Sequence, residues 1–375
     1  TEVLAEQHFK NFSAWFKNSN IKIELLTGKM PISKRRVIYQ DLEGGVIDIL
    51  IGTHAVFQDK VKMKNLGLVV VDEQQRFGVK QRFDLVKKSS DQIMPHQLFM
   101  TATPIPRTLA MTIFADLETS KIDELPPGRK PVETLVYSNK KKDEIVKRLE
   151  TVCKSGNQVF WLCTMIEESE NLDVQAADEA KEWIKENTNG LNIGLVHSKL
   201  SKDQRDKAIE NFRSGKTDVL VCTTVIEVGM DVPNASLMVI ENAERLGLSQ
   251  LHQLRGRVGR GEKKSNCILI YSKNVSNQGK ERLEVLRKFD NGFDIAEKDL
   301  LMRGGGNPIG PQQSGIPKFK IANLEFDKDL LYYAHEDASE IIKNNRNLKS
   351  KDGENIRILL HLMNKDKSLS LLETG

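Results

Sequence analysis

Cysteine is scarce in this chain of 375 residues, and the few cysteines follow no pairing pattern. No Cys-x-x-Cys pair occurs, and the four cysteines lie in or beside apolar runs: Cys153, Cys163, Cys222 and Cys267. A disulfide scaffold or a structural zinc site needs cysteines at close or regular spacing. We therefore predict buried free thiols, a reducing compartment and a cytoplasmic protein.

Long apolar runs and a strong charge imbalance are missing too. No apolar stretch approaches the ~20 residues that cross a bilayer, and no signal segment opens the sequence. We therefore expect no membrane partner. The net charge of +4 tolerates an anionic partner without requiring one. With 39% hydrophobic residues, the length suits two compact domains and an extension.

The chain also has no phosphate-binding loop. Gly215-Lys216-Thr217 resembles the end of the pattern Gly-x-x-x-x-Gly-Lys-Thr, but the position of the first glycine holds Glu210. A phosphate loop runs from a strand into a helix, whereas here a predicted helix ends at Gly215 and a predicted strand begins at Val219. We interpret Gly215 as a helix C-cap.

Arginines and glycines are concentrated in residues 250–261, which read Gln-Leu-His-Gln-Leu-Arg-Gly-Arg-Val-Gly-Arg-Gly. Guanidinium groups bind phosphate oxygens through paired hydrogen bonds, and glycine lets a phosphate or a backbone approach closely. A basic turn on a solvated surface, formed by Arg255, Arg257 and Arg260, is the alternative. We favour a phosphate-binding role, because Gln253 and the two later arginines keep the spacing Gln-x-x-Gly-Arg-x-x-Arg.

Asp72 and Glu73 directly follow a predicted apolar strand at 66–71, which we expect to be covered on both faces of a parallel sheet. Open parallel sheets bind their ligands at the carboxyl ends of the strands. One carboxylate there can bind Mg²⁺, and the other can orient or deprotonate an attacking water. The alternative is a solvated Asp-Glu pair of no chemical significance.

Hydroxyl groups follow several other predicted strands. These are Thr53 after 46–51, Thr101 and Thr103 after 98–100, and Thr223 and Thr224 after 219–222. Thr223 and Thr224, at the end of their strand, suit hydrogen bonds to a nucleic-acid backbone. Gly229 and Asp231 come shortly afterwards, and Asp231 is a candidate for holding a ribose or orienting an arginine. The alternative is an ordinary turn between a strand and a helix.

Predicted strands and helices alternate along most of the chain, which indicates an α/β fold with parallel sheets. Helices are expected at 1–16, 34–43, 143–154 and 202–212, and a further helical stretch follows residue 163 and ends at about 186. Strands are expected at 21–26, 46–51, 66–71, 132–137, 159–163, 193–196 and 219–222. Residues 123–131 contain three prolines and a glycine, a composition that predicts a linker. We therefore predict a first domain over 1–122, a second over 132–272, and an extension over 273–375 with a helical tail from about 327.

The ordered set of motifs resembles the RecG family, the bacterial ATP-dependent helicases of superfamily 2 that remodel branched DNA. Residues 1–8, 52–55, 72–79 and 101–108 resemble motifs Ia, Ib, II and III, residues 223–231 resemble motif V, and residues 250–261 resemble motif VI with its arginine finger. The related transcription-repair coupling factor shares residues 76–79 and 103–108. Residues 122–129 and 241–247 fit RecG better, and the resemblance covers nearly the whole chain.

This resemblance implies two RecA-like motor domains that hydrolyse ATP with Mg²⁺ and move along branched or double-stranded DNA. We expect the protein to be a monomer. It implies that Asp72 binds Mg²⁺ and that Glu73 activates water. Arg257 and Arg260 would contact the γ-phosphate from the second domain, and Gln253 would sense it.

The remaining family positions concern the nucleotide, the DNA and the coupling between them. Gly229 and Asp231 would belong to the nucleotide site, and Thr101 and Thr103 would couple hydrolysis to movement. DNA contact or coupling is implied for Thr53, Thr223, Thr224 and Arg303.

Three features depart from the family pattern. The sequence starts at motif Ia with Thr1, so we expect the first motor domain to lack its phosphate loop and the wedge domain to be absent. Gln75 stands where the family usually has histidine. In the coupling hairpin at 303–315, Gln312 replaces an arginine that the family uses to convert hydrolysis into translocation, and Pro311 removes a backbone donor.

Two hypotheses follow for function. The first is a RecG-type helicase motor acting on stalled forks and Holliday junctions. The second is a catalytically inactive fragment of such a helicase. Residues 1–375 alone are expected to lack appreciable ATPase activity, because a phosphate loop normally holds the β- and γ-phosphates.

Overall fold

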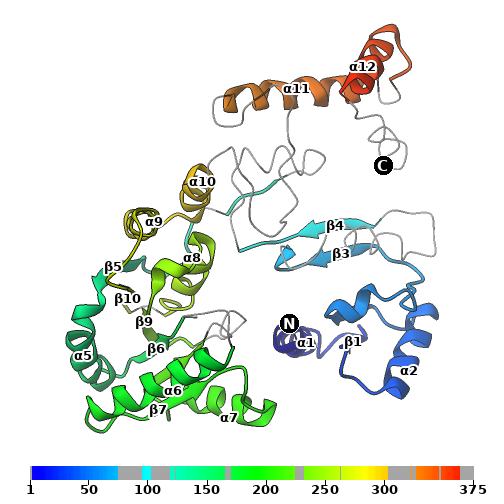
Figure 1. The fold of residues 1–375 in the computed structure, drawn as a ribbon. Coiled ribbons are helices and arrows are strands. Elements are labelled where there is room, and N and C mark those ends of the chain that lie inside the picture. The colour runs from blue at the N-terminus through cyan, green and yellow to red at the C-terminus, as the bar shows by residue number, and fades with distance from the viewer. Residues whose placement is uncertain are drawn as a thin grey trace. The chain divides into compact units, whose positions relative to one another are not determined.

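The computed structural model describes residues 2–74, 95–102, 119–122, 124–164, 170–223, 232–261, 263–302, 322, 327–345 and 348–363. The chain forms two compact units. The first comprises Thr1–Thr103 and Pro126–Lys288, and the second comprises Pro104–Leu125 and Phe289–Gly375. Figure 1 labels most of the helices and strands of both units.

The N-terminal residues form a small α/β layer. It contains α1 (Glu2–Trp15), β1 (Ile23–Leu26), α2 (Ile32–Glu43), β2 (Ile49–Gly52) and the short 3₁₀ helix η1 (His54–Phe57). The strands β1 and β2 pair in parallel, and both helices pack against β1. Leu26, Ile38 and Leu42 form the core of this layer together with Ala55 and Val61. The predicted helices at 1–16 and 34–43 and the predicted strands at 21–26 and 46–51 are confirmed.

A second parallel pair joins β3 (Leu68–Val71) to β4 (His96–Phe99). Val69 and Val71 are buried, whereas Leu68 is 58% exposed and Val70 is 51% exposed. The prediction that this strand is covered on both faces is therefore wrong for the described residues. The reason is that its described apolar neighbours, which include Phe57, gather at the face of Val69 and Val71.

The larger body of the first unit is a six-stranded parallel sheet in the order β5-β10-β9-β6-β8-β7. Its strands are β5 (Val132–Ser138), β6 (Gln158–Leu162), β7 (Ile193–Val196), β8 (Val219–Cys222), β9 (Ala235–Ile240) and β10 (Ser265–Tyr271). Every residue of β6, β8 and β9 is buried. Continuous apolar strands of this kind require cover on both faces of the sheet.

Helices supply that cover. They are α5 (Lys142–Lys154), α6 (Glu170–Glu186), α7 (Lys202–Arg213), α8 (Leu248–Arg255) and α9 (Asn277–Lys288), with 3₁₀ turns η3 (Asn139–Lys141) and η5 (Ala243–Arg245). Leu149 of α5 and Ile184 of α6 share one core cluster with Trp161. Phe160, the residue before Trp161 on the strand, faces the other way and meets Phe212 of α7 with ring centroids 4.8 Å apart.

At the end of α7 the C-cap is Ser214, and Gly215, interpreted as the C-cap, follows it by one residue. The helix begins with a capping box in which the Ser201 hydroxyl accepts from the backbone of Gln204. It ends at Arg213, and Gly215 adopts a left-handed φ of 76° while donating its N–H to Phe212 at 3.1 Å. This is the C-terminal geometry that glycine favours, so residues 215–217 are not part of a phosphate loop.

The second unit is helical where it is described. It contains α10 (Gly292–Met302), α11 (Lys328–Asn344) and α12 (Lys351–Leu362), and the ammonium of Lys121 lies 4.2 Å from the ring centroid of Phe293. The predicted helical tail from about residue 327 is confirmed. Among the described residues, no helix is long and apolar enough to cross a membrane. The predicted domain bounds at 1–122, 123–131, 132–272 and 273–375 stay predictions.

Candidate active site

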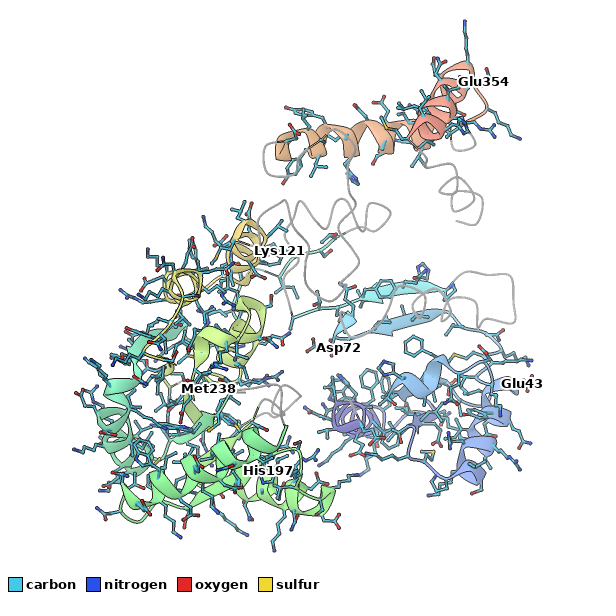
Figure 2. All side chains as sticks on the ribbon, in the orientation of Figure 1. Glu43, Asp72, Lys121, His197, Met238 and Glu354 are labelled. Atoms are coloured by element: carbon cyan, nitrogen blue, oxygen red, sulfur yellow. The ribbon has the colours of Figure 1, made fainter. Side chains whose placement is uncertain are left out.

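Asp72 and Glu73 lie just beyond the carboxyl end of β3, and Thr101 lies just beyond the carboxyl end of β4. Because β3 and β4 are parallel and in register, these residues leave the same edge of the pair. The backbone N–H of Gln74 donates to the carbonyl of Met100 at 3.0 Å and holds the two strand ends together. Figure 2 labels Asp72 at this end of β3.

The backbone of Glu73 is in an unusual conformation. Its φ is 53°, in the left-handed region that residues other than glycine seldom adopt. The Oδ1 atom of Asp72 accepts a hydrogen bond from the N–H of Glu73 at 2.8 Å, which supports this turn. Backbone strain of this kind costs about 1–3 kcal/mol and is typical of functional sites.

The second carboxylate oxygen of Asp72 faces the N-terminal helix. Its Oδ2 atom lies 3.6 Å from Nε2 of His8, and the two side chains are 38% and 41% exposed. No group of three or more metal-ligating side chains occurs in the part of the chain that the structure describes. An accessible single carboxylate fits Mg²⁺, which usually takes one or two carboxylates and completes its shell with water and phosphate oxygens.

Thr53 is held at the end of β2 by its neighbours. It is the N-cap of η1, and its backbone N–H donates to the carbonyl of Leu26 at 3.3 Å. A Cβ atom at the preceding residue, Gly52, would collide with that carbonyl and with the side chain of Val56. Only glycine fits there, so Thr53 is presented at a fixed position beyond the strand.

The arginine-rich segment begins in α8. Leu248, Leu251 and Leu254 bury one side of this helix, and Gln253 is half-buried on it. The helix ends at Arg255, and the following loop carries a half-buried Arg257 and an exposed Arg260.

Arg255 differs from the two arginines that follow it. It is 4% exposed, and its Nη1 atom donates to the carbonyl of Leu286 at 2.9 Å and to the hydroxyl of Thr134 at 3.2 Å. Its Nη2 atom lies 3.1 Å from Nδ1 of His252. Burial, and then the charge of Arg255, lower the pKa of His252 to about 4. Arg255 is therefore an internal anchor that joins α8 to β5 and α9.

The loop after α8 packs tightly on the body of the sheet. Val258 is fully buried, and Gly259 has a φ of 73°. A Cβ atom at Gly259 would lie 2.8 Å from a methyl group of Val132, and one at Gly261 would lie 2.9 Å from the carbonyl of Pro233. Gly259 and Gly261 are thus required by close packing against the protein itself.

A polar cluster at the carboxyl ends of β6 and β9 was not identified from the sequence. The Nζ atom of Lys142 lies 2.9 Å from Oε1 of Glu241, which also accepts from the indole N–H of Trp161 at 2.5 Å. The ammonium of Lys142 lies 4.4 Å from the ring centroid of Trp183. Lys142, Trp183 and Glu241 line a cavity of about 520 Å³. The one sequence feature that could have indicated this cluster is the resemblance of residues 241–247, which include Glu241, to RecG.

Thr223 occupies the predicted place beyond β8, but its surroundings limit it. The residue is 4% exposed, and its N–H donates to the carbonyl of Val196 at 3.2 Å. A DNA contact from its side chain stays a prediction. Other predicted positions lie outside the described residues: Gln75, Thr103, Thr224, Gly229, Asp231, Arg303, Pro311 and Gln312.

Three family models match successive parts of the chain. Residues 1–112 match the DEAD/DEAH box helicase model, and residues 140–262 match the helicase conserved C-terminal domain. Residues 289–369 match the model "ATP-dependent DNA helicase RecG, domain 3, C-terminal". The predicted fold, two RecA-like domains followed by a helical region, is confirmed.

Two relatives carry the same description, ATP-dependent DNA helicase RecG. The chain is 49% identical to that of Haemophilus influenzae over 345 residues, which are 92% of this chain and 50% of the relative. It is also 49% identical to that of Escherichia coli strain K12 over 333 residues, which are 88% of this chain and 48% of the relative. The chain thus spans about half the length of these relatives.

Solved structures give the same picture. A structure of RecG bound to a three-way DNA junction matches with a TM-score of 0.64 and 40% identity, covering 88% of this chain and 42% of that one. Yeast Dbp5 bound to RNA and ADP BeF3 matches with a TM-score of 0.55 at 16% identity, covering 80% of this chain and 78% of that one. The second likeness shows the fold alone.

Proposed function

The chain belongs to the RecG family of ATP-dependent DNA helicases, and on that premise we propose that it is the motor of a helicase that remodels branched DNA. The observation that carries the proposal is the 49% identity to RecG over 92% of the chain. At that length the match overlaps both helicase-domain models and the RecG-specific one. The junction-bound RecG structure supports branched DNA as the substrate class.

The proposed nucleotide site takes residues from both motor domains. Bound Mg²⁺–ATP would supply the phosphoryl group and the metal charge. Asp72 would hold the metal through its accessible carboxylate, and Glu73 would orient or deprotonate the attacking water. Arg257 and Arg260 would stabilise the negative charge that develops at the γ-phosphate, and Gln253 would sense the nucleotide. Gly229 and Asp231 are proposed to complete this site.

The proposed DNA contacts lie at strand ends. Thr53, Thr223 and Thr224 would hydrogen-bond to the phosphate backbone, which positions the duplex without recognising its sequence. Thr101 and Thr103 would couple hydrolysis to movement, and Arg303 would belong to the coupling hairpin. Binding through phosphates should weaken steeply as salt rises.

We also propose that the protein is monomeric and cytoplasmic. All four cysteines are buried and none forms a disulfide. Burial raises the pKa of Cys153 and of Cys267 to about 12, which keeps these thiols protonated and unreactive at neutral pH. Such thiols suit a reducing compartment.

ATP hydrolysis with forked DNA tests the proposal. A phosphate loop is supplied by joining residues 1–375 to the N-terminal part of a RecG relative. The joined protein should show DNA-stimulated hydrolysis, and Asp72→Asn or Arg257→Ala should lower kcat roughly 10³-fold or more. Residues 1–375 alone should show no appreciable hydrolysis.

Two outcomes would contradict the proposal. One is a joined protein that folds and binds DNA but hydrolyses ATP equally well with and without Asp72. The other is DNA-stimulated turnover by residues 1–375 alone that disappears in Asp72→Asn, which would show that the phosphate loop is dispensable here.

A further inference from the structure

The predicted linker contains a turn that aims one arginine at the loop after α8. The turn is Pro126-Pro127-Gly128-Arg129, in which Gly128 has a φ of 82° and the N–H of Arg129 donates to the carbonyl of Pro126 at 3.1 Å. Proline followed by glycine at the two central positions is the pattern of a type II turn. The turn is therefore encoded locally, and it fixes where the side chain of Arg129 begins.

The guanidinium of Arg129 holds two carbonyls of the arginine loop. Its Nε atom donates to the carbonyl of Gly259 at 3.1 Å, and its Nη2 atom donates to the carbonyl of Gly256 at 3.3 Å. These two carbonyls flank Arg257 and Val258. Because the guanidinium is planar and its donors are fixed relative to each other, the two bonds hold the carbonyls of Gly256 and Gly259 at the same time.

Arg129 also lies beside the second arginine of the loop. Arg129 and Arg260 both line a cavity of about 410 Å³, together with Pro233 and Gly261. Arg129 is half-buried, whereas its neighbour Lys130 is exposed. The loop is thus held on one side by the buried side chain of Val258 and on another side by the hydrogen bonds of Arg129.

We propose that Arg129 is a positioning residue that holds the loop 256–261 so that Arg257 and Arg260 are presented together to the nucleotide. This inference rests on the proposed function of those two arginines. It also assigns the linker a second role, since the segment that connects the predicted motor domains is bonded directly to the loop that would act on the γ-phosphate.

The first test measures how well the backbone of the loop is protected from hydrogen exchange, and it requires no catalytic activity. Amide hydrogen exchange is followed in residues 254–262 of the full chain for the wild type, Arg129→Ala, Arg129→Lys and the matched control Lys130→Ala. We expect exchange in this segment to rise at least about tenfold in Arg129→Ala. It should rise less in Arg129→Lys, which keeps one donor, and should not change in Lys130→Ala. Unchanged exchange in a folded Arg129→Ala protein would overturn the proposal.

The second test asks whether Arg129 acts through the loop arginines. In the protein with a phosphate loop, Arg129→Ala should lower kcat for ATP about 10- to 100-fold with little change in KM, as expected when catalytic groups are displaced by about 1 Å. Arg129→Lys should recover part of this loss, and Lys130→Ala should be normal. In an Arg257→Ala, Arg260→Ala background, Arg129→Ala should have no further effect on kcat.

The outcomes separate the two proposals. If the double-arginine variant keeps full activity, the proposed function of those arginines fails, while the exchange experiment still decides whether Arg129 holds the loop. If the effect of Arg129→Ala multiplies with that of the double-arginine variant, Arg129 acts by another route and the positioning role is wrong.

Discussion

Residues of one chemical type take different roles within a few positions of this chain. Arg255 is enclosed and bonded to Thr134 and Leu286, whereas Arg260 is exposed on the following loop. A guanidinium keeps its charge in both places, so its surroundings decide its role. The donors of the buried Arg255 bond to the protein, whereas Arg257 is half-buried and Arg260 is exposed on the loop that follows.

Arg255→Met is expected to destabilise the protein through its internal bonds. The variant keeps much of the side-chain volume but leaves the carbonyl of Leu286 and the hydroxyl of Thr134 without this donor. We expect a loss of about 2–4 kcal/mol in the free energy of unfolding, measured by urea denaturation. The control is Arg148→Met on the exposed side of α5, for which a change below about 0.5 kcal/mol is expected. Equal losses of unfolding free energy in the two variants would show that Arg255 does not stabilise the protein through these bonds.

His252 predicts a specific pH dependence of stability. Its pKa is lowered to about 4, first by burial and then by Arg255, against about 6.5 in an unfolded chain. The unfolded state therefore binds the proton more readily, so this stabilisation is complete above about pH 6.5 and is lost as the pH falls toward 4.

Between pH 7 and pH 4.5, the wild type should lose on the order of 2 kcal/mol more than His252→Gln. Urea denaturation at both pH values measures this difference, in which the contributions of other titrating groups cancel. A smaller loss in the wild type than in the variant would show that His252 is not buried in its neutral form.

At the scale of elements, the loop between α8 and β10 is shaped by contacts on several sides. Val258 enters the core, Gly259 passes close to Val132 of β5, and Arg129 bonds to the carbonyls of Gly256 and Gly259. The helix α8 is held by its three buried leucines and by the bonds of Arg255 to β5 and α9. The conformation of the loop is thus determined by distant segments of the chain.

Gly259→Ala should disturb this loop more than its backbone conformation alone would predict. Both Gly259 and Gly190 have left-handed φ angles, 73° and 74°, but only at Gly259 would a Cβ atom meet a neighbour, at 2.8 Å. Gly190→Ala should cost about 1–2 kcal/mol from the backbone. Gly259→Ala should cost a further 1–3 kcal/mol or so from overpacking.

Thermal or urea unfolding measures both costs. Adding Val132→Ala to Gly259→Ala should recover part of the extra loss, because it removes the methyl group that the new Cβ atom meets. Equal destabilisation by Gly259→Ala and Gly190→Ala would mean that the loop moves away from Val132 at no measurable cost in free energy.

At the scale of the whole molecule, hydrolysis and movement are expected to depend on different segments. Asp72 and Arg257 belong to the helicase-domain matches, whereas residues 303–315, for which the resemblance implies a coupling hairpin, lie within the RecG-specific match at 289–369. At these residues we predict that Gln312 stands in place of the family's arginine and that Pro311 removes a backbone donor. A neutral amide replaces a charge-assisted anchor there.

In the protein with a phosphate loop, Gln312→Arg combined with Pro311→Thr should raise fork unwinding more than it raises ATP hydrolysis. The restored arginine can contribute about 1.5–3 kcal/mol at the hairpin without altering the nucleotide site. Unwinding per ATP hydrolysed is the measurement. Full unwinding efficiency before the substitutions would show that the hairpin is already competent.

The sequence by itself determined the element types, the α/β class and the family. Alternating apolar runs and helical spacing predicted nearly all of the described elements of residues 1–60 and 132–222, because these signals are local. The order of motifs was sufficient to indicate RecG. The helices α8, α9 and α10 and the strands β9 and β10 were not predicted. Motif VI was interpreted for its chemistry, and the other segments were not assigned.

Only the tertiary structure decided which polar residues meet. Arg255 is 121 residues from Thr134, Lys142 is 99 residues from Glu241, and Arg129 is 130 residues from Gly259. No local pattern encodes such pairs, because they form when strands from different parts of the chain become neighbours in one sheet. Burial follows from the same packing, so Arg255 became an anchor while Arg257 and Arg260 stayed near the surface.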